Sequence, residues 1–250
     1  MIKKVKKKFF FLILATVGLI LVLYSCQKGN RCMHLYGEEF QETRILSNFN
    51  RLRINSLMNV YWHLDSQTKV VIKTGKNLLP YIKTELSNGT LAITNLNRCN
   101  WLRKYKRIEM HVYSPTFKYI DLYGNGDFYL LDTLFNDTIK VDNWSDISKV
   151  SLLVNCSVFS YSQNSGTGDT YINGSAGVSF LWAMGYGYIH ARNFKTGYSY
   201  ITQKSTGNFY VNVEKEIGAN LYSCGNVYVY GKPYYIEQKS FSTGKLIMAE

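Results

Sequence analysis

The heptapeptide GNGDFYL at Gly124–Leu130 recurs along the chain with few changes. Close copies are GTGDTYI at Gly166–Ile172, STGNFYV at Ser205–Val211 and SCGNVYV at Ser223–Val229. With the second glycine of each copy taken as a marker, and weaker copies included, the markers are Gly126, Ser148, Gly168, Gly187, Gly207, Gly225 and Gly244. Their spacings are 22, 20, 19, 20, 18 and 19 residues. This near-constant period indicates that each copy builds one unit of a repeat architecture.

The intervals between the markers favour strands rather than helices. They contain no helix-length amphipathic run and are rich in Tyr, Val, Ile, Thr, Asn and Gly, which suit strands and turns. Leucine-rich repeats share the period, but their L-x-x-L-x-L pattern is missing. We therefore predict an all-β fold in which each unit of about 20 residues forms one coil of a single-stranded parallel β-helix, a solenoid.

Two columns of mostly apolar residues follow the markers. The positions two after the marker are Phe128, Val150, Thr170, Ile189, Phe209, Val227 and Leu246. The positions four after it are Leu130, Leu152, Ile172, Ala191, Val211, Val229 and Met248. Side chains alternate across a strand, so both columns share one face and should form the core. One coil cannot bury such a face alone, which explains why the motif recurs.

The position between these columns should point outward. It holds Tyr129, Ser151, Tyr171, His190, Tyr210, Tyr228 and Ile247. Because neighbouring strands lie about 4.8 Å apart, the rings should form an exposed ladder. Such rings can bind sugars or a protein partner, or they can simply stabilise the sheet through cross-strand pairs. Our candidate binding face is Tyr129, Tyr171, His190, Tyr210 and Tyr228.

The turn residues have structural explanations. The marker glycines either adopt φ > 0 or allow close packing between coils. An Asp or Asn follows several markers and should satisfy backbone donors locally. These residues are Asp127, Asp169, Asn208 and Asn226.

Residues 46–125 precede the clear repeats and predict longer strands with alternating faces. These strands are expected within 49–65, 68–86, 89–94 and 106–114, with a short helical turn near 77–86. The sequence SNGT at Ser87–Thr90 predicts a hairpin turn. We expect these strands to lead into the solenoid within one domain, 46–250, behind a tether at 26–45.

The first 25 residues predict an export signal. Five lysines within residues 3–8 precede an uncharged, almost wholly apolar run at Phe9–Tyr24. The run ends in LYSC at Leu23–Cys26, which resembles a bacterial lipobox, although Tyr24 stands where a small residue is usual. We predict a signal peptide at 1–25 and a lipid-anchored Cys26 in the outer membrane of the cell envelope, facing either side. An uncleaved membrane helix or a plain secreted chain are the alternatives.

Net charge and cysteine content limit the kinds of partner and the disulfides that the sequence predicts. The net charge of +12 includes five signal lysines, so +12 − 5 leaves +7 for the mature chain. Outside the signal the compact basic run is RKYKR at Arg103–Arg107, which suits a solvated loop or strand edge, so no nucleic-acid partner is predicted. An oxidising compartment permits disulfides, but the sequence leaves open any pairing among Cys32, Cys99, Cys156 and Cys224. Cys156 and Cys224 stand in apolar, strand-like contexts.

The titratable residues do not predict catalysis. Asp127, Asp146 and Asp169 lie at or near turns, where a capping role suffices. The histidines are separated and lack metal-ligand spacing; they are His34, His63, His111 and His190. We therefore predict no enzyme activity, no metal and no cofactor. A polysaccharide-active β-helix enzyme, which would need paired carboxylates in a cleft, is the alternative.

Four stretches resemble a known family. They are FNRLRI at 49–54, VVIKTGKNLLPYIKTELSNGTLAI at 70–93, MHVYSPTFKYIDLYGNGDF at 110–128 and GNVYVYGKPYYIEQKSFSTGKLI at 225–247. Their order and spacing resemble the auto-transporter adhesin head domain, or GIN domain, of Gram-negative lipoproteins. The resemblance implies a right-handed β-helix and defines no catalytic motif. Ser148 and Tyr123 depart from the family pattern.

These features together predict an exported, lipid-anchored β-helical protein that presents a binding or adhesion surface. Its partners would be the membrane, through the lipid on Cys26, and a glycan or protein ligand. A passive structural lipoprotein of the envelope is a further alternative.

Overall fold

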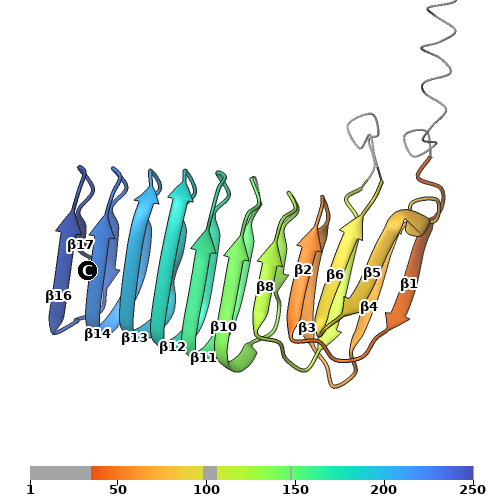
Figure 1. Ribbon diagram of the computed structural model, residues 1–250, viewed down its shortest axis with the longest axis horizontal. Helices are drawn as coiled ribbons and strands as arrows, with labels where there is room; N and C mark the ends of the chain where they lie inside the picture. The colour runs from red at the N-terminus through yellow and green to blue at the C-terminus, as the bar shows by residue number, and fades with distance from the viewer. Residues whose placement is uncertain (1–34, 98–105, 147, 250) are drawn as a thin grey trace, which may run out of the picture.

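The repeated strands form a solenoid of about six turns, each of about 20 residues, as predicted. The computed structural model describes residues 35–97, 106–146 and 148–249. Figure 1 shows the coils stacked side by side along one axis, with strands in front and behind. The solenoid is therefore a flattened coil made of two facing sheets.

The described residues form 17 strands and one short 3-10 turn. The strands before the clear repeats are β1 Glu39–Ile45, β2 Arg51–Asn55, β3 Asn59–Leu64, β4 Lys69–Gly75, β5 Ile82–Ser87, β6 Thr90–Asn95, β7 Glu109–Ser114 and β8 Tyr119–Leu122, with the 3-10 turn η3 at Leu79–Tyr81. Those that follow are β9 Phe128–Leu130, β10 Leu134–Asn143, β11 Val150–Gln163, β12 Thr170–Gly185, β13 Ile189–Ser205, β14 Phe209–Leu221, β15 Val227–Tyr230, β16 Tyr235–Ser240 and β17 Leu246–Met248.

Two sheets result from the pairing of these strands. The front sheet, nearest the viewer in Figure 1, contains β5, β6, β2, β8, β10, the second halves of β11–β14, and β16. The back sheet contains β1, β4, β7, β3, β9, the first halves of β11–β14, β15 and β17. Because β11–β14 bend from the back sheet into the front sheet, hydrogen bonds connect all 17 strands.

The two apolar columns pack between the sheets. Residues two after the markers stand in parallel register from Phe128 through Val150 to Leu246. Members of both columns are buried in every coil except the last, which confirms the core prediction for those coils. Thr170 is also buried, and its hydroxyl is hydrogen-bonded to the buried Tyr161 hydroxyl.

The marker glycines stack directly on backbone carbonyls of the preceding coil. A Cβ on Gly126 would lie 1.6 Å from the Met58 oxygen, and one on Gly207 would lie 2.0 Å from the Gly187 oxygen. No marker glycine has a positive φ. Of the two explanations, close packing is therefore correct. Ser148, at the one marker position without glycine, is buried, and its hydroxyl contacts that of Ser145.

The Asp and Asn residues after the markers connect coils rather than acting locally. Asp127 Oδ1 accepts a hydrogen bond from the Lys149 N–H at 3.0 Å, and Asn208 Oδ1 accepts one from the Asn226 N–H at 2.8 Å. The prediction of local capping was wrong for these residues. Each side chain instead satisfies the backbone donor one coil further along, at the same position of the turn.

The first coil in the sequence is not the first in space. β2 pairs with both β6 and β8, and β3 pairs with both β7 and β9, all in parallel. The chain thus inserts β2–β3 between two coils that follow it in sequence. The buried Asp121 of β8 secures this insertion by accepting hydrogen bonds from Arg51 at 2.9 Å and Arg53 at 3.1 Å.

The predicted hairpin and helical turn are present. β5 and β6 form an antiparallel hairpin, with Asn88 at φ 48° and Gly89 at φ 69° in the turn. η3 lies just before this hairpin. Within the expected tether at 26–45, however, Glu39–Ile45 form β1, which pairs antiparallel with β4. These residues could add a strand because β4 leaves one edge free for them.

The two ends of the solenoid differ. At the end with the N-terminal strands, the antiparallel strands β1, β4 and β5 cover the parallel coils, and Val70 and Ile72 of β4 are fully buried. At the other end the sheets stop at β16 and β17, which have no further strand beside them among the described residues (Figure 1).

Candidate binding surfaces

A row of aromatic side chains crosses the outer face of the back sheet. The strand registers align His111, Tyr61, Tyr129, Ser151, Tyr171, His190, Tyr210, Tyr228 and Ile247. We call this row the aromatic ladder. It contains all five residues of the predicted binding face, which lie between buried neighbours and point outward.

The sequence analysis missed Tyr61 and His111, which extend the ladder. Tyr61 follows Met58 by three residues, and the Met58 carbonyl lies under the marker Gly126. The stretch MNVYW therefore matches CGNVYVY at 224–230 with Met58 at the marker position. This signal was available, but methionine replaces the glycine that defined the repeat.

The rings of the ladder cover one another. The Tyr171 and His190 centroids are 4.6 Å apart, those of His190 and Tyr210 are 5.3 Å apart, and those of Tyr210 and Tyr228 are 5.2 Å apart. The corresponding interplanar angles are 14°, 2° and 9°. Each residue is half-buried. A ligand at the ladder would therefore meet ring edges and hydroxyls, because most ring faces are occupied by a neighbouring ring.

Ser151 interrupts the ladder beside a shallow depression. Asp127 and Asp169 line it two coils apart, about 9.6 Å along the sheet, with Lys149 between them. Asp127 also accepts a hydrogen bond from the Tyr129 hydroxyl at 3.3 Å, and Asp169 Oδ1 accepts one from the Tyr188 N–H at 2.9 Å. Each carboxylate therefore also accepts a backbone hydrogen bond from the neighbouring coil, Asp127 from the Lys149 N–H and Asp169 from the Tyr188 N–H.

Two histidines form a pair at the N-terminal side of the ladder. His63 Nε2 and His111 Nδ1 are 2.9 Å apart, and the His63 ring stacks on Tyr113 at 4.6 Å. Burial is the main cause that lowers the pKa of both imidazoles, and Lys73 lowers them further. Within the described ranges, no three His, Cys, Asp or Glu side chains gather as a metal site would require.

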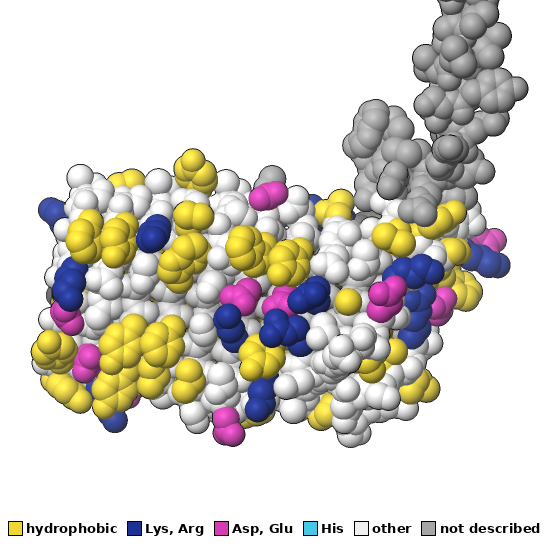
Figure 2. Space-filling view, in the orientation of Figure 1, with side chains coloured by type: hydrophobic (Ala, Val, Ile, Leu, Met, Phe, Trp, Pro, Cys, Tyr) yellow, Lys and Arg dark blue, Asp and Glu magenta, His cyan; other side chains and the backbone are white. Residues whose placement is uncertain are grey.

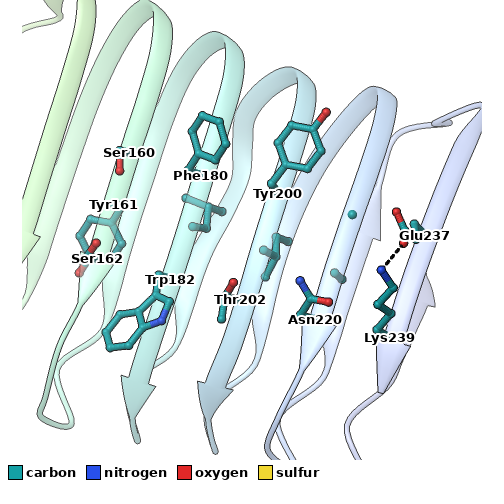
Figure 3. A pocket seen from close by; sticks show the side chains of 14 residues that line it. Ser160, Tyr161, Ser162, Phe180, Trp182, Tyr200, Thr202, Asn220, Glu237 and Lys239 are labelled. Carbon is teal, nitrogen blue, oxygen red and sulfur yellow. Dashed lines mark ion pairs between the residues drawn. The ribbon is translucent and has the colours of Figure 1, made fainter. Parts of the chain in front are cut away.

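A second surface lies on the outer face of the front sheet, which the sequence analysis did not identify. A hollow of about 220 Å³ extends over β11–β14 and β16 (Figure 3). We call it the front-sheet hollow; the side chains used below are Phe180, Trp182, Tyr200, Thr202, Asn220 and Lys239. Figure 2 shows hydrophobic side chains gathered over the C-terminal coils of this face and charged side chains over its middle.

Two aromatic rings in the front-sheet hollow lack a ring on at least one side. Trp182 lies between Ser162 and Thr202 in its row, and no ring stacks on it among the described residues. Tyr200 stacks on Phe180 at 5.6 Å, but its neighbour on the other side is Gly218, which has no side chain. The Tyr200 ring lies close over this glycine, since a Cβ on Gly218 would be 3.2 Å from Tyr200 Cδ1. The Trp182 ring, unlike those of the ladder, therefore leaves room for a ligand against it.

Polar groups beside these rings are free. Neither the Trp182 N–H nor the side chains of Thr202 and Asn220 have a hydrogen-bond partner in the described part of the chain. The buried Trp62 N–H, by contrast, donates to Ser114 Oγ at 2.8 Å. At the far side of the hollow, Lys239 Nζ and Glu237 Oε1 form an ion pair at 2.8 Å. The two charges cancel, so this border has no net charge.

Sequence analysis could not find this surface, because it lies in the second half of each unit, where the distance from the marker varies. Phe180 follows its marker by 12 residues, Tyr200 by 13 and Gly218 by 11. Register shifts occur between Ala191 and Lys195 and elsewhere in β12–β14. Counting from the markers therefore does not align these residues, although they are neighbours in space.

The remaining predictions about cysteines and anchoring have mixed outcomes. Cys26, Cys32 and Cys99 lie outside the described residues. Cys156 is half-buried in β11, where burial raises the pKa of its thiol to about 12. Cys224 is exposed in the turn after β14, so the expected strand context was wrong. In the ranges that the structure describes, no helix has the length and apolarity needed to cross a membrane.

Several solved structures share this fold. A "putative adhesin" from Bacteroides fragilis NCTC 9343 is 20% identical, with a TM-score of 0.77, over 84% of this chain and 96% of that one. A "putative adhesin" from Parabacteroides merdae ATCC 43184 is 17% identical, with a TM-score of 0.62, over 86% and 97%. A "putative lipid binding protein" from Parabacteroides distasonis ATCC 8503 is 15% identical, with a TM-score of 0.64, over 86% and 98%.

Among curated proteins, none matches this chain. One family model matches residues 48–233, which is most of the sequence. The match includes the inserted coil, the ladder from Tyr61 to Tyr228, and the front-sheet hollow except its border on β16. These relatives are described as adhesins or lipid-binding proteins and not as enzymes. The chain belongs to the family described as "Putative auto-transporter adhesin, head GIN domain".

Proposed function

We propose that this protein is an exported, adhesin-like lipoprotein that binds a saccharide ligand in the front-sheet hollow. Membership of the adhesin head family supports an adhesion-like role in the cell envelope. The observation that carries the choice of ligand is that Trp182 and Tyr200 stand beside unpartnered polar groups in an open hollow.

The chemistry of the hollow suits a sugar. A pyranose ring has apolar C–H faces and a rim of hydroxyls, so it needs both a flat aromatic surface and hydrogen-bonding groups. Trp182 supplies the first requirement, and its own N–H together with Asn220 supplies the second. Because Lys239 is already paired with Glu237, the site should prefer a neutral saccharide over an anionic one.

The aromatic ladder is the second candidate surface, as the sequence predicted. Its rings present edges and hydroxyls, which suit a polar protein surface better than the face of a sugar. Two surfaces on opposite sheets can be tested independently, because substitutions in one do not touch the other.

The test is saccharide binding by the full chain on a glycan array, followed by titration of the best ligand. Trp182→Ala should weaken binding at least about tenfold, equivalent to about 1.4 kcal/mol. The matched control is Tyr186→Ala, which removes an exposed aromatic ring from a turn outside the hollow. Loss of binding in Tyr210→Ser/Tyr228→Ser, with Trp182→Ala unaffected, would instead place the ligand on the ladder.

The anchor is tested separately. The proposal requires a lipid on Cys26, because the lysine-rich segment before it ends in LYSC. Metabolic labelling with a fatty-acid analogue should mark the wild type and not Cys26→Ala. Equal labelling of the two proteins would exclude lipidation at this residue.

A further inference from the structure

The C-terminal end of the solenoid exposes side chains that are core residues in every earlier coil. Ile236 of β16 stands in register with Ile217, yet Ile236 is 44% exposed and Ile217 is fully buried. Met248 of β17 stands in register with the buried Val229 and is 46% exposed. Among the described residues no strand covers these side chains, whereas β1, β4 and β5 cover the opposite end. Solenoids normally require a polar cap at such an end.

This end also has free backbone groups. The Phe241 N–H donates to the Leu221 oxygen at 2.7 Å, toward β14. Because backbone groups alternate along a strand, the N–H and C=O groups of Ile236, Gln238 and Ser240 point away from β14. An unpaired strand edge of this kind is a template for pairing with another strand.

The charges on β16 identify the strand that fits. Glu237 and Lys239 both point outward, on either side of Gln238. In an antiparallel pair of two β16 strands centred on Gln238, Glu237 of each copy lies opposite Lys239 of the other. Centring the pair on Glu237 would place two glutamates opposite each other, and centring it on Lys239 would place two lysines opposite each other. Like charges in that position destabilise a sheet.

The geometry points to an end-to-end, two-fold pairing of two copies of this chain through β16, centred on Gln238. The same register places Tyr235 of one copy opposite Phe241 of the other, and both rings are exposed in the single chain. Such a contact is isologous and closes on itself, so it yields a dimer and not a filament.

Pairing would join the two front-sheet hollows. Glu237 and Lys239 border the hollow, as Figure 3 shows, so the hollows of the two copies would lie on either side of the shared strand pair. A ligand with repeated units could then contact both, which raises avidity without any new contact. The pairing does not depend on the ligand, and Trp182→Ala is expected to pair normally.

The experiment measures the protein mass of the full chain in detergent by light scattering over a concentration series. The wild type should shift from the mass of a monomer to that of a dimer. Glu237→Lys and Lys239→Glu should each remain monomeric, because each places like charges opposite each other. When the two variants are mixed, opposite charges face each other at both positions, and the dimer should return.

Lys232→Glu is the matched control, since it reverses an exposed charge just before β16, and it should pair like the wild type. Circular dichroism melting of each variant checks that the fold is retained. A wild type that stays monomeric at every concentration overturns the inference. Dimers that survive both charge reversals, or variants that fail to pair when mixed, also overturn it because β16 would not be the contact.

Discussion

At the residue scale, Gly187 illustrates how one neighbouring atom restricts the sequence. A Cβ at this position would lie 2.1 Å from the Gly168 oxygen and 2.5 Å from Gln163 Nε2. The carbonyl belongs to another marker, so it cannot move without disturbing the next turn. Glycine therefore recurs at the markers because adjacent coils approach too closely for a Cβ, and not because these positions need a special φ angle.

The substitution Gly187→Ala should lower the free energy of unfolding by at least about 2 kcal/mol, the range expected for overpacking. Urea denaturation measures the change. Tyr186→Ala, one residue earlier and exposed, is the control and should stay within about 0.5 kcal/mol of the wild type. If the two variants were equally stable, the turns would have to separate more easily than the structure indicates.

The His63–His111 pair should make stability depend on pH. The pKa of each imidazole is lowered in the folded chain, although Asp132 opposes this shift for His63 and Glu109 opposes it for His111. The unfolded chain, with a histidine pKa near 6.5, therefore binds protons first as the pH falls. The contribution of this pair to the free energy of unfolding should be complete above about pH 6.5. It should decrease as the pH falls from there through the lowered pKa values of the folded chain.

Thermal melting between pH 7 and pH 5 measures this effect. His63→Gln removes one titrating ring and should flatten the dependence of the melting temperature on pH in this window. Asp65, whose pKa is lowered by its hydrogen bond to Lys69, contributes only at more acidic pH and leaves this window unaffected. An unchanged slope in His63→Gln would mean that other groups cause the pH dependence.

At the element scale, the markers made half of each coil predictable. The positions just after a marker keep a fixed register from β9 to β17, so the buried columns and the outward ladder followed from counting. The second halves could not be aligned, because bulges in β12–β14 change the count between marker and front sheet. For this reason the ladder could be predicted and the front-sheet hollow could not.

The insertion of β2–β3 was also beyond sequence analysis. Alternation in Arg51–Asn55 indicates a strand but not its neighbours. The Asp121 contacts that fix its position join residues about 70 apart in the chain. A single sequence gives no sign of that pairing, although each strand is recognisable alone.

The hydrogen bonds between successive turns should be separately measurable. Asn208→Ala leaves the Asn226 N–H without its partner, which should cost about 1–3 kcal/mol. Asn208→Asp keeps the accepting oxygen and should cost less. Urea denaturation of the two variants compares them. An alanine variant as stable as the aspartate variant would show that water replaces the side chain at no cost.

At the scale of the whole molecule, the solenoid is a one-dimensional stack in which each coil is stabilised by its neighbours. The middle coils have a neighbour on both sides, the N-terminal coils have an antiparallel cover, and β16–β17 have a neighbour on one side within the described residues. Stability should therefore be lowest at the C-terminal end, where the core columns are exposed.

Hydrogen exchange measured by mass spectrometry tests this gradient. Peptides from β16 and β17 should exchange fastest, those from β12 and β13 slowest, and those from β4 should be protected because its neighbours are β1 and β7. If two copies pair through β16, its protection should also rise with protein concentration in the wild type and not in Glu237→Lys. Protection that is uniform along the solenoid would contradict the nearest-neighbour description. Low protection in β4 would show that the antiparallel strands do not act as a cap, because a cap must remain closed for the coils beneath it to stay buried.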